Sequence, residues 1–125
     1  MSNFKKGDSI TGVSGNRNGK VWVQHYTVLS SGKLQMHLLK LDGSNVKTRH
    51  YHDTQDTYPT RFVMTADFTE VFAIDCALRN IETTRANMEI RKAHAIARDG
   101  SWSAFEQDVY AKNAAEIHGP EVAYL

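Results

Sequence analysis

The sequence predicts an α+β domain in which an N-terminal antiparallel β-meander of about five strands is packed by one long and one shorter C-terminal helix. Residues 1–64 contain short β-branched and aromatic runs separated by Gly, Asn and Ser, which is typical of strands joined by tight turns. Residues 68–98 contain neither Pro nor Gly, which favours a long helix. At 125 residues the chain fits one domain, 1–125, with the meander over 1–64 and the helical part over 65–125.

Five consecutive segments carry strand signals. They span residues 8–14, 21–29, 34–41, 46–52 and 61–64. The segment 21–29 is the strongest, because its run is the richest in residues that favour strands. Gly and Asn in the intervening turns tolerate the positive φ angles of tight reversals. We expect residues 53–57 to form a loop and the strand after Pro59 to lie at a sheet edge.

Capping signals mark the ends of the long helix. Asp67 stands three residues before Glu70, an arrangement that satisfies backbone amides at a helix start. Gly100 supplies a stop, because glycine adopts the left-handed conformation that often ends a helix. We therefore expect one helix over residues 68–98, either unbroken or interrupted near residues 83–84.

A second helix follows. Ser101 or Ser103 caps its start, and Ser103 with Glu106 forms a capping box. The helix is expected to run to about Ile117, before His118-Gly119-Pro120. The tail 121–125 is apolar enough to dock as an added strand or on a neighbouring molecule.

Because side chains alternate along a strand, the residues of the central strands divide between the two faces of the sheet. The face expected to form the helix-packed core carries Val21, Val23, His25, Thr27, Leu29, Leu34, Met36, Leu38 and Tyr51. The other face carries Trp22, Gln24, Tyr26, Val28, Gln35, His37, Leu39, Leu41, Val46, Thr48, His50 and His52. A surface that interleaves aromatic rings with Gln, Thr and His can stack a ring and bond its edges, so this face is a candidate for ligand contact. The alternative is that its aromatic residues pack under a loop or helix and its histidines are solvated.

The spacing of the histidines is also compatible with a metal-binding site. His50 and His52 point to the same side of their strand, and His37 is expected opposite them on the adjacent strand. No residue that would orient these imidazoles is identifiable, so we expect no stoichiometric metal and no cofactor.

A polar stripe runs along the predicted long helix beside an apolar seam of Ile74, Leu78, Ile81 and Met88. The stripe follows steps of three and four through Asn80, Thr84, Asn87, Arg91, His94 and Arg98. It is either a solvated face or an anion site, since Asn and Arg at this spacing can hold a phosphate or the edge of a base. Arg61, with Lys47 and Arg49, would complete the anion site if helix and sheet meet there.

Composition and motifs disfavour several classes of function. The single cysteine, Cys76, excludes an internal disulfide and fits a reducing compartment, and no run approaches the length of a membrane span, so we expect a cytoplasmic protein. The serines have no neighbouring base, so we expect no enzymatic activity. Residues 1–64 hold nine Lys and Arg against four Asp, but the whole chain is near neutral at +1, which makes nucleic acid an unlikely partner.

The candidate ligand-binding residues are Trp22, Tyr26, His37, His50, Arg61, Asn87, Arg91, His94 and Arg98. With its basic β-meander followed by two helices, the chain resembles small accessory proteins of tailed phages. Its organisation is similar to that of the Thoeris anti-defence sponges, for which Trp22, Tyr26, Arg61, Asn87, Arg91 and Arg98 are the corresponding candidates. The resemblance implies a non-enzymatic viral oligomer that sequesters cyclic ADP-ribose-type signals through an aromatic residue and arginines near a helix.

Two functions therefore stay open. The first is a small binding protein that captures a nucleotide-like anionic ligand. The second is an inhibitor or assembly protein that binds a host protein through an apolar and aromatic surface. The opposite charges of the two halves and the apolar tail predict a homo-oligomer in either case.

Overall fold

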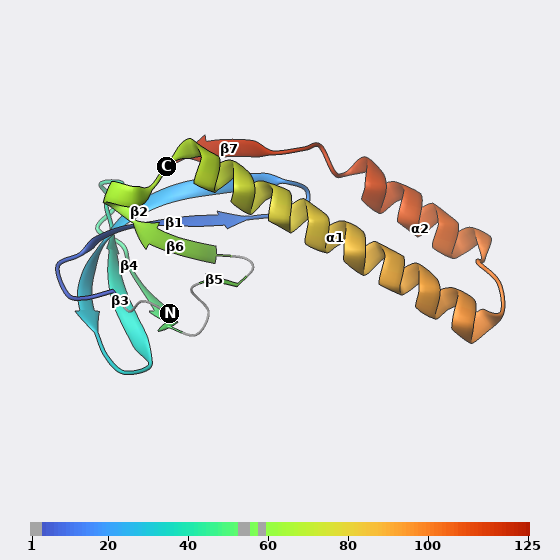
Figure 1. The fold of residues 1–125 in the computed structure, drawn as a ribbon, viewed down its shortest axis with the longest axis horizontal. Helices are drawn as coiled ribbons and strands as arrows, with labels where there is room; N and C mark the ends of the chain where they lie inside the picture. The colour runs from blue at the N-terminus through green and yellow to red at the C-terminus, as the bar shows by residue number, and fades with distance from the viewer. Residues whose placement is uncertain (1–3, 53–55, 58–59) are drawn as a thin grey trace.

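The computed structural model describes residues 4–52, 56–57 and 60–125, and it confirms the predicted α+β class (Figure 1). The described residues form a seven-stranded sheet with the order β4-β3-β2-β1-β6-β5, and β7 pairs with β2 beside this path. The strands are β1 (Ser9–Gly15), β2 (Lys20–Ser31), β3 (Gln35–Lys40), β4 (Lys47–Tyr51), β5 (Asp56–Thr57), β6 (Thr60–Met64) and β7 (Glu121–Tyr124).

The first four strands form the predicted meander, whereas β6 returns to pair with β1. The two-residue strand β5 falls in a stretch predicted to be a loop, of which residues 53–55 lie outside the described part of the chain. Only Thr60 and Arg61 pair with β5, so the rest of β6 is an edge of the described sheet, as expected for the strand after Pro59.

Each face of the sheet carries its own apolar cluster. The cluster on one face consists of Phe4, Ile10, Tyr26, Val28, Met36, Leu38 and Phe62. The cluster on the other face joins Val13, Val21 and Val23 to Ala73, Cys76 and Ala77 of the long helix. The long strands β1 and β2 are therefore buried on opposite faces at their two ends, which explains why simple alternation does not describe their burial.

The predicted sorting of the two faces is wrong in part. Val21 and Val23 do face the helix, but Met36 and Leu38 lie with Tyr26 and Val28 in the other cluster. The cause is an irregularity of β2 between Val28 and Ser30, which shifts the register of β3 by one residue. A shift of one residue turns every side chain of a strand to the opposite face.

Gly12 allows aromatic rings to lie against the sheet. It pairs with Gln24 and with Phe62, and a Cβ atom at this position would lie 2.7 Å from Cε1 of Phe62 and 3.1 Å from Cε2 of Tyr26. Only glycine leaves room for both rings, since carbon atoms at such distances overlap.

The long helix α1 (Glu70–Asp99) is a single unbroken element with a rise of ~45 Å. Its cap is Thr69 and not Asp67, because Asp67 belongs to the preceding turn η2 (Thr65–Asp67) and the Thr69 hydroxyl accepts the amide of Phe72. Gly100, at φ 75°, ends the helix as predicted. The sheet-facing residues are the small Ala73, Cys76 and Ala77, whereas Leu78 of the predicted seam is exposed.

The second helix, α2 (Ala104–Ala115), packs antiparallel to the far half of α1, and the two form a hairpin that projects beyond the sheet (Figure 1). The Ser103 hydroxyl accepts the amide of Glu106, which confirms the predicted cap, but the helix ends at Ala115 and not at Ile117. The chain then returns to the sheet as β7, parallel to β2, so the tail docks within its own chain.

Candidate functional site

A pocket of about 360 Å³ lies where three segments meet: the turn between β1 and β2, the middle of α1 and the end of α2. Its size falls within the range of small-molecule sites. It is lined by Arg17 and Asn18 of the turn, by Asn80, Thr83, Thr84, Asn87, Met88 and Arg91 of α1, and by Asn113, Glu116 and Ile117 of α2 and the segment after it.

Backbone contacts hold these segments together. The Thr84 hydroxyl lies 2.8 Å from the carbonyl oxygen of Arg17 and 2.9 Å from that of Asn80. The amide of His118 donates to the carbonyl of Asn18 at 3.2 Å, which ties the end of the hairpin to the turn. Gly19, at φ 102°, packs so closely on the carbonyl of Gly119 that a side chain there would overlap it. The pocket walls are thus held by bonds to main-chain carbonyls, in which Thr84 is the lining residue that uses its side chain.

One polar residue of the pocket lining, Asn80, is mostly buried. Asn80 is only 9% exposed, and its side-chain amide makes no hydrogen bond to another residue of the described ranges, so the amide is available to a ligand. Met88, 8% exposed, and the half-buried Ile117 add apolar surface to the lining.

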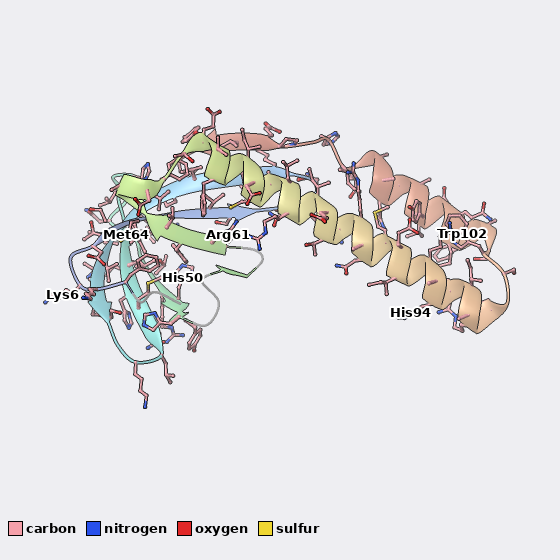
Figure 2. The ribbon with its side chains drawn as sticks, in the orientation of Figure 1. Lys6, His50, Arg61, Met64, His94 and Trp102 are labelled. Atoms are coloured by element: carbon pink, nitrogen blue, oxygen red, sulfur yellow. The ribbon has the colours of Figure 1, made fainter. Side chains whose placement is uncertain are left out.

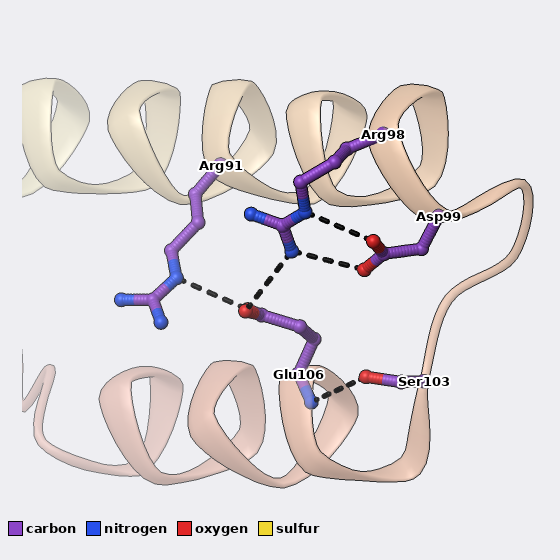
Figure 3. A network of polar contacts seen from close by, with 5 residues as sticks. All are labelled: Arg91, Arg98, Asp99, Ser103 and Glu106. Carbon is purple, nitrogen blue, oxygen red and sulfur yellow. Dashed lines mark hydrogen bonds and ion pairs between the residues drawn. The ribbon is translucent and has the colours of Figure 1, made fainter.

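Arg91 brings a positive charge to the rim, and its position is set by Glu106 of α2 (Figure 3). Its Nε lies 3.1 Å from Oε2 of Glu106, whose side chain is only 13% exposed, and its two terminal nitrogens point away from that carboxylate. Arg98 lies 4.0 Å from the same carboxylate and makes two bonds of 2.9 Å to Asp99. These bonds lower the pKa of the Asp99 carboxyl.

The structure brings together one part of the predicted polar stripe. Asn80, Thr84, Asn87 and Arg91 all line the pocket. Arg98 is instead held by Asp99 and Glu106, and His94 is exposed on the side of α1 away from α2 (Figure 2).

Arg61 lies outside this pocket and is tied to α1. Its guanidinium lies 3.3 Å from Asp75, 3.5 Å from the sulfur of Cys76 and 4.8 Å from the ring centre of Phe72. Its role in the structure is therefore to join β6 to α1 (Figure 2). Burial raises the pKa of the Cys76 thiol despite this neighbouring positive charge.

The aromatic candidates also lie outside the pocket. Tyr26 is 6% exposed in the core, where its ring meets those of Phe62 and His50 at 5.9 and 6.4 Å. Burial raises the pKa of Tyr26 and lowers that of His50. Trp22 is half-buried beside Lys20, whose ammonium lies 5.4 Å from the ring centre.

The expected grouping of three histidines is wrong. His37 pairs with Arg49 and is exposed, whereas His50 pairs with Met36 one residue along, so the two imidazoles lie on opposite faces. Nε2 of His52 lies 2.8 Å from the carbonyl oxygen of Gly32. Within the described ranges, no three His, Cys, Asp or Glu side chains lie close enough together to hold a metal.

The sequence patterns did not reveal five of the polar lining residues: Arg17, Asn18, Thr83, Asn113 and Glu116. The first two lie in a Gly- and Asn-rich stretch that signals a turn and nothing more. Asn113 and Glu116 fall three residues apart near the end of α2, which is the one local sign that they share a face.

Comparison with protein-family models, curated proteins and solved structures finds no match to this chain. None of the helices in the described part of the chain is both long and apolar enough to cross a membrane. The geometry of the pocket is thus the basis for a functional proposal.

Proposed function

We propose that this protein is a non-enzymatic binding protein that captures a small nucleotide-like anionic ligand in the pocket between α1, α2 and the β1–β2 turn. One observation carries the proposal: two arginines, Arg17 and Arg91, line the same pocket as Asn80, a mostly buried residue whose side-chain amide has no partner in the described ranges. Guanidinium groups bind phosphate through charge-assisted bonds, and amides bind the edges of bases.

Further features favour binding over catalysis. The Thr84 hydroxyl lies against two backbone carbonyls, and no His, Cys or Lys belongs to the described lining of the pocket. Nucleophilic catalysis needs a nucleophile beside a base that activates it. Capture without turnover suits a protein that sequesters a signalling nucleotide in the cytoplasm, which is the use implied by the resemblance to viral anti-defence sponges.

Calorimetry with a panel of mono-, di- and cyclic nucleotides tests the proposal. We expect one member to bind the wild-type protein, and Arg91→Glu to weaken that binding at least tenfold, because reversal replaces an attractive charge with a repulsive one. Arg85→Glu is the matched control, since Arg85 is exposed on the same helix outside the pocket lining. Equal binding by both variants would contradict the proposal.

A second candidate, an inhibitor or assembly protein that binds a host protein, is favoured by apolar side chains on the helices. Val71, Ile90 and Phe105 are 74, 52 and 71% exposed. Exposed apolar side chains are buried when they meet a partner protein, and Phe is among the residues enriched in such interfaces. If the wild-type protein gives no heat with any nucleotide, this second function becomes the preferred one.

A further inference from the structure

The two ends of the pocket differ in chemistry. Thr84, which contacts Arg17, and Arg91 lie seven residues apart on α1, a rise of ~10 Å. The end near Arg91 presents a guanidinium with Asn87 and no carboxylate among the described lining residues. The other end is formed by Asn80 together with the segment that follows α2. A ligand that fills the pocket therefore meets different groups at each end.

The end opposite Arg91 contains a carboxylate. Glu116 is the C-terminal cap of α2 and is exposed, and its side chain has no ion-pair partner within the described ranges. It follows the last turn of the helix, where backbone carbonyls carry partial negative charge. Arg17 also lines this end, and Glu116 is the one carboxylate of the described lining, so Glu116 is the group that attracts N–H donors of a ligand.

The side-chain amide of Asn80 adds a donor and an acceptor to the same pocket. In base recognition, Asn bonds both the amino group and the adjacent ring nitrogen of adenine, and a carboxylate accepts from the amino group of cytosine. A base with a carbonyl in place of the amino group would direct its lone pairs at Glu116. The side chain of Ile117, which follows Glu116 in the lining, offers apolar contact to the face of such a ring.

We infer that the ligand is a nucleotide whose base carries an exocyclic amino group, with the base at Asn80 and Glu116 and the phosphate at Arg91. The inference rests on the proposed function and adds the class of base to it. Glu116 and Asn80 are the residues that select the base, and Arg91 binds the phosphate of any nucleotide.

Two matched pairs of nucleotides test the inference by calorimetry: AMP against IMP, and CMP against UMP. The members of each pair differ mainly in the exchange of an amino group for a carbonyl. We expect at least one pair to show tighter binding of the amino-bearing member by about tenfold or more, because a hydrogen bond to a charged group is worth ~1.5–3 kcal/mol.

Glu116→Gln should abolish or invert this preference, since an amide can donate to a carbonyl whereas a carboxylate cannot. Glu82→Gln is the control, because Glu82 is an exposed carboxylate of α1 outside the pocket lining. Unfolding midpoints should be unchanged for both variants, since both positions are exposed.

The outcomes separate this inference from the proposed function. Equal affinity within both pairs, or a preference that survives Glu116→Gln, would overturn the inference while nucleotide binding itself stands. No binding of any nucleotide would overturn both. A preference lost in Glu116→Gln and kept in Glu82→Gln would support the assignment of Glu116 to the amino group.

Discussion

The sheet and the helical hairpin, formed by the far half of α1 with α2, are stabilised in different ways. Ile10, Met36 and Leu38 in the sheet are fully buried. Helix α2 contributes no buried residue, and α1 buries only Met88 and Ala95 in the hairpin. The sheet is thus held by its apolar clusters, as the interiors of domains generally are.

Polar and aromatic contacts hold the hairpin instead. The ammonium of Lys92 lies 4.3 Å from the ring centre of Trp102 and 5.9 Å from that of Tyr110. The Tyr110 hydroxyl donates to Glu89, which raises the pKa of Tyr110, and Arg91 pairs with Glu106. Because apolar burial contributes little here, the polar residues between the hairpin and the sheet are available for a ligand. The candidate site therefore lies where the fold depends least on apolar packing.

The largest expected effect is a core truncation in the sheet. Leu38→Ala should lower the free energy of unfolding by ~2–5 kcal/mol, because Leu38 is fully buried and its loss leaves a cavity. Phe105→Ala removes a larger side chain from the hairpin. It should nevertheless change the free energy of unfolding by less than ~0.5 kcal/mol, since Phe105 is 71% exposed. Urea unfolding measures both. Similar losses for the two variants would remove the distinction between the regions.

A change at the aromatic contact should loosen the hairpin alone. Trp102→Ala removes the contact with Lys92 and an edge-to-face pair with Tyr110 at 5.4 Å, together worth ~1–2 kcal/mol. Hydrogen exchange should accelerate over residues 102–115 and stay unchanged in β1 and β2. Faster exchange throughout the sheet would show that the two regions unfold as one unit.

We predict that copies of the chain contact one another through the sheet region. Tyr124 and Leu125, at the end of β7, are 57 and 62% exposed. We expect light scattering to give the mass of a homo-oligomer, and the double substitution Tyr124→Lys with Leu125→Lys to reduce it toward the monomer. Phe105→Lys, in the hairpin, is the control that should leave the mass unchanged. A wild-type monomer at high micromolar concentration would refute the prediction.

The smallest effect concerns pH and His50. Burial, with a smaller contribution from Lys40, lowers the pKa of His50 below its ordinary value of 6.5. The unfolded state then binds the proton more readily, so this stability is present above pH ~6.5 and is lost as the pH falls through the lowered pKa. His50→Gln should flatten the decline of the unfolding midpoint between pH 7.5 and 5, and His94→Gln, at an exposed position of the hairpin, should not. If both variants flattened the pH dependence of the unfolding midpoint equally, the burial of His50 in the sheet would not be the cause of this dependence.

Local signals in the sequence were sufficient to predict the fold class, the meander and the end of α1. Turn residues, β-branched runs and Gly100 act through backbone conformations that depend on a few neighbouring residues. The same holds for the polar stripe, because a spacing of three and four places Asn80, Thr84, Asn87 and Arg91 on one side of any helix. These features could therefore be predicted without knowing which residues pack against them.

Tertiary structure alone decided which partners these elements meet. The irregularity of β2 placed Met36 and Leu38 on the same face as Tyr26, since a one-residue shift exchanges the faces of a strand. The register of β3 and β4, which pairs His50 with Met36, separated His50 from His37. The pocket arose because α2 folds back along α1 and brings Asn113 and Glu116 to Arg17, nearly one hundred residues away in sequence. Such long-range contacts depend on packing across the whole molecule, which no local pattern of residues encodes.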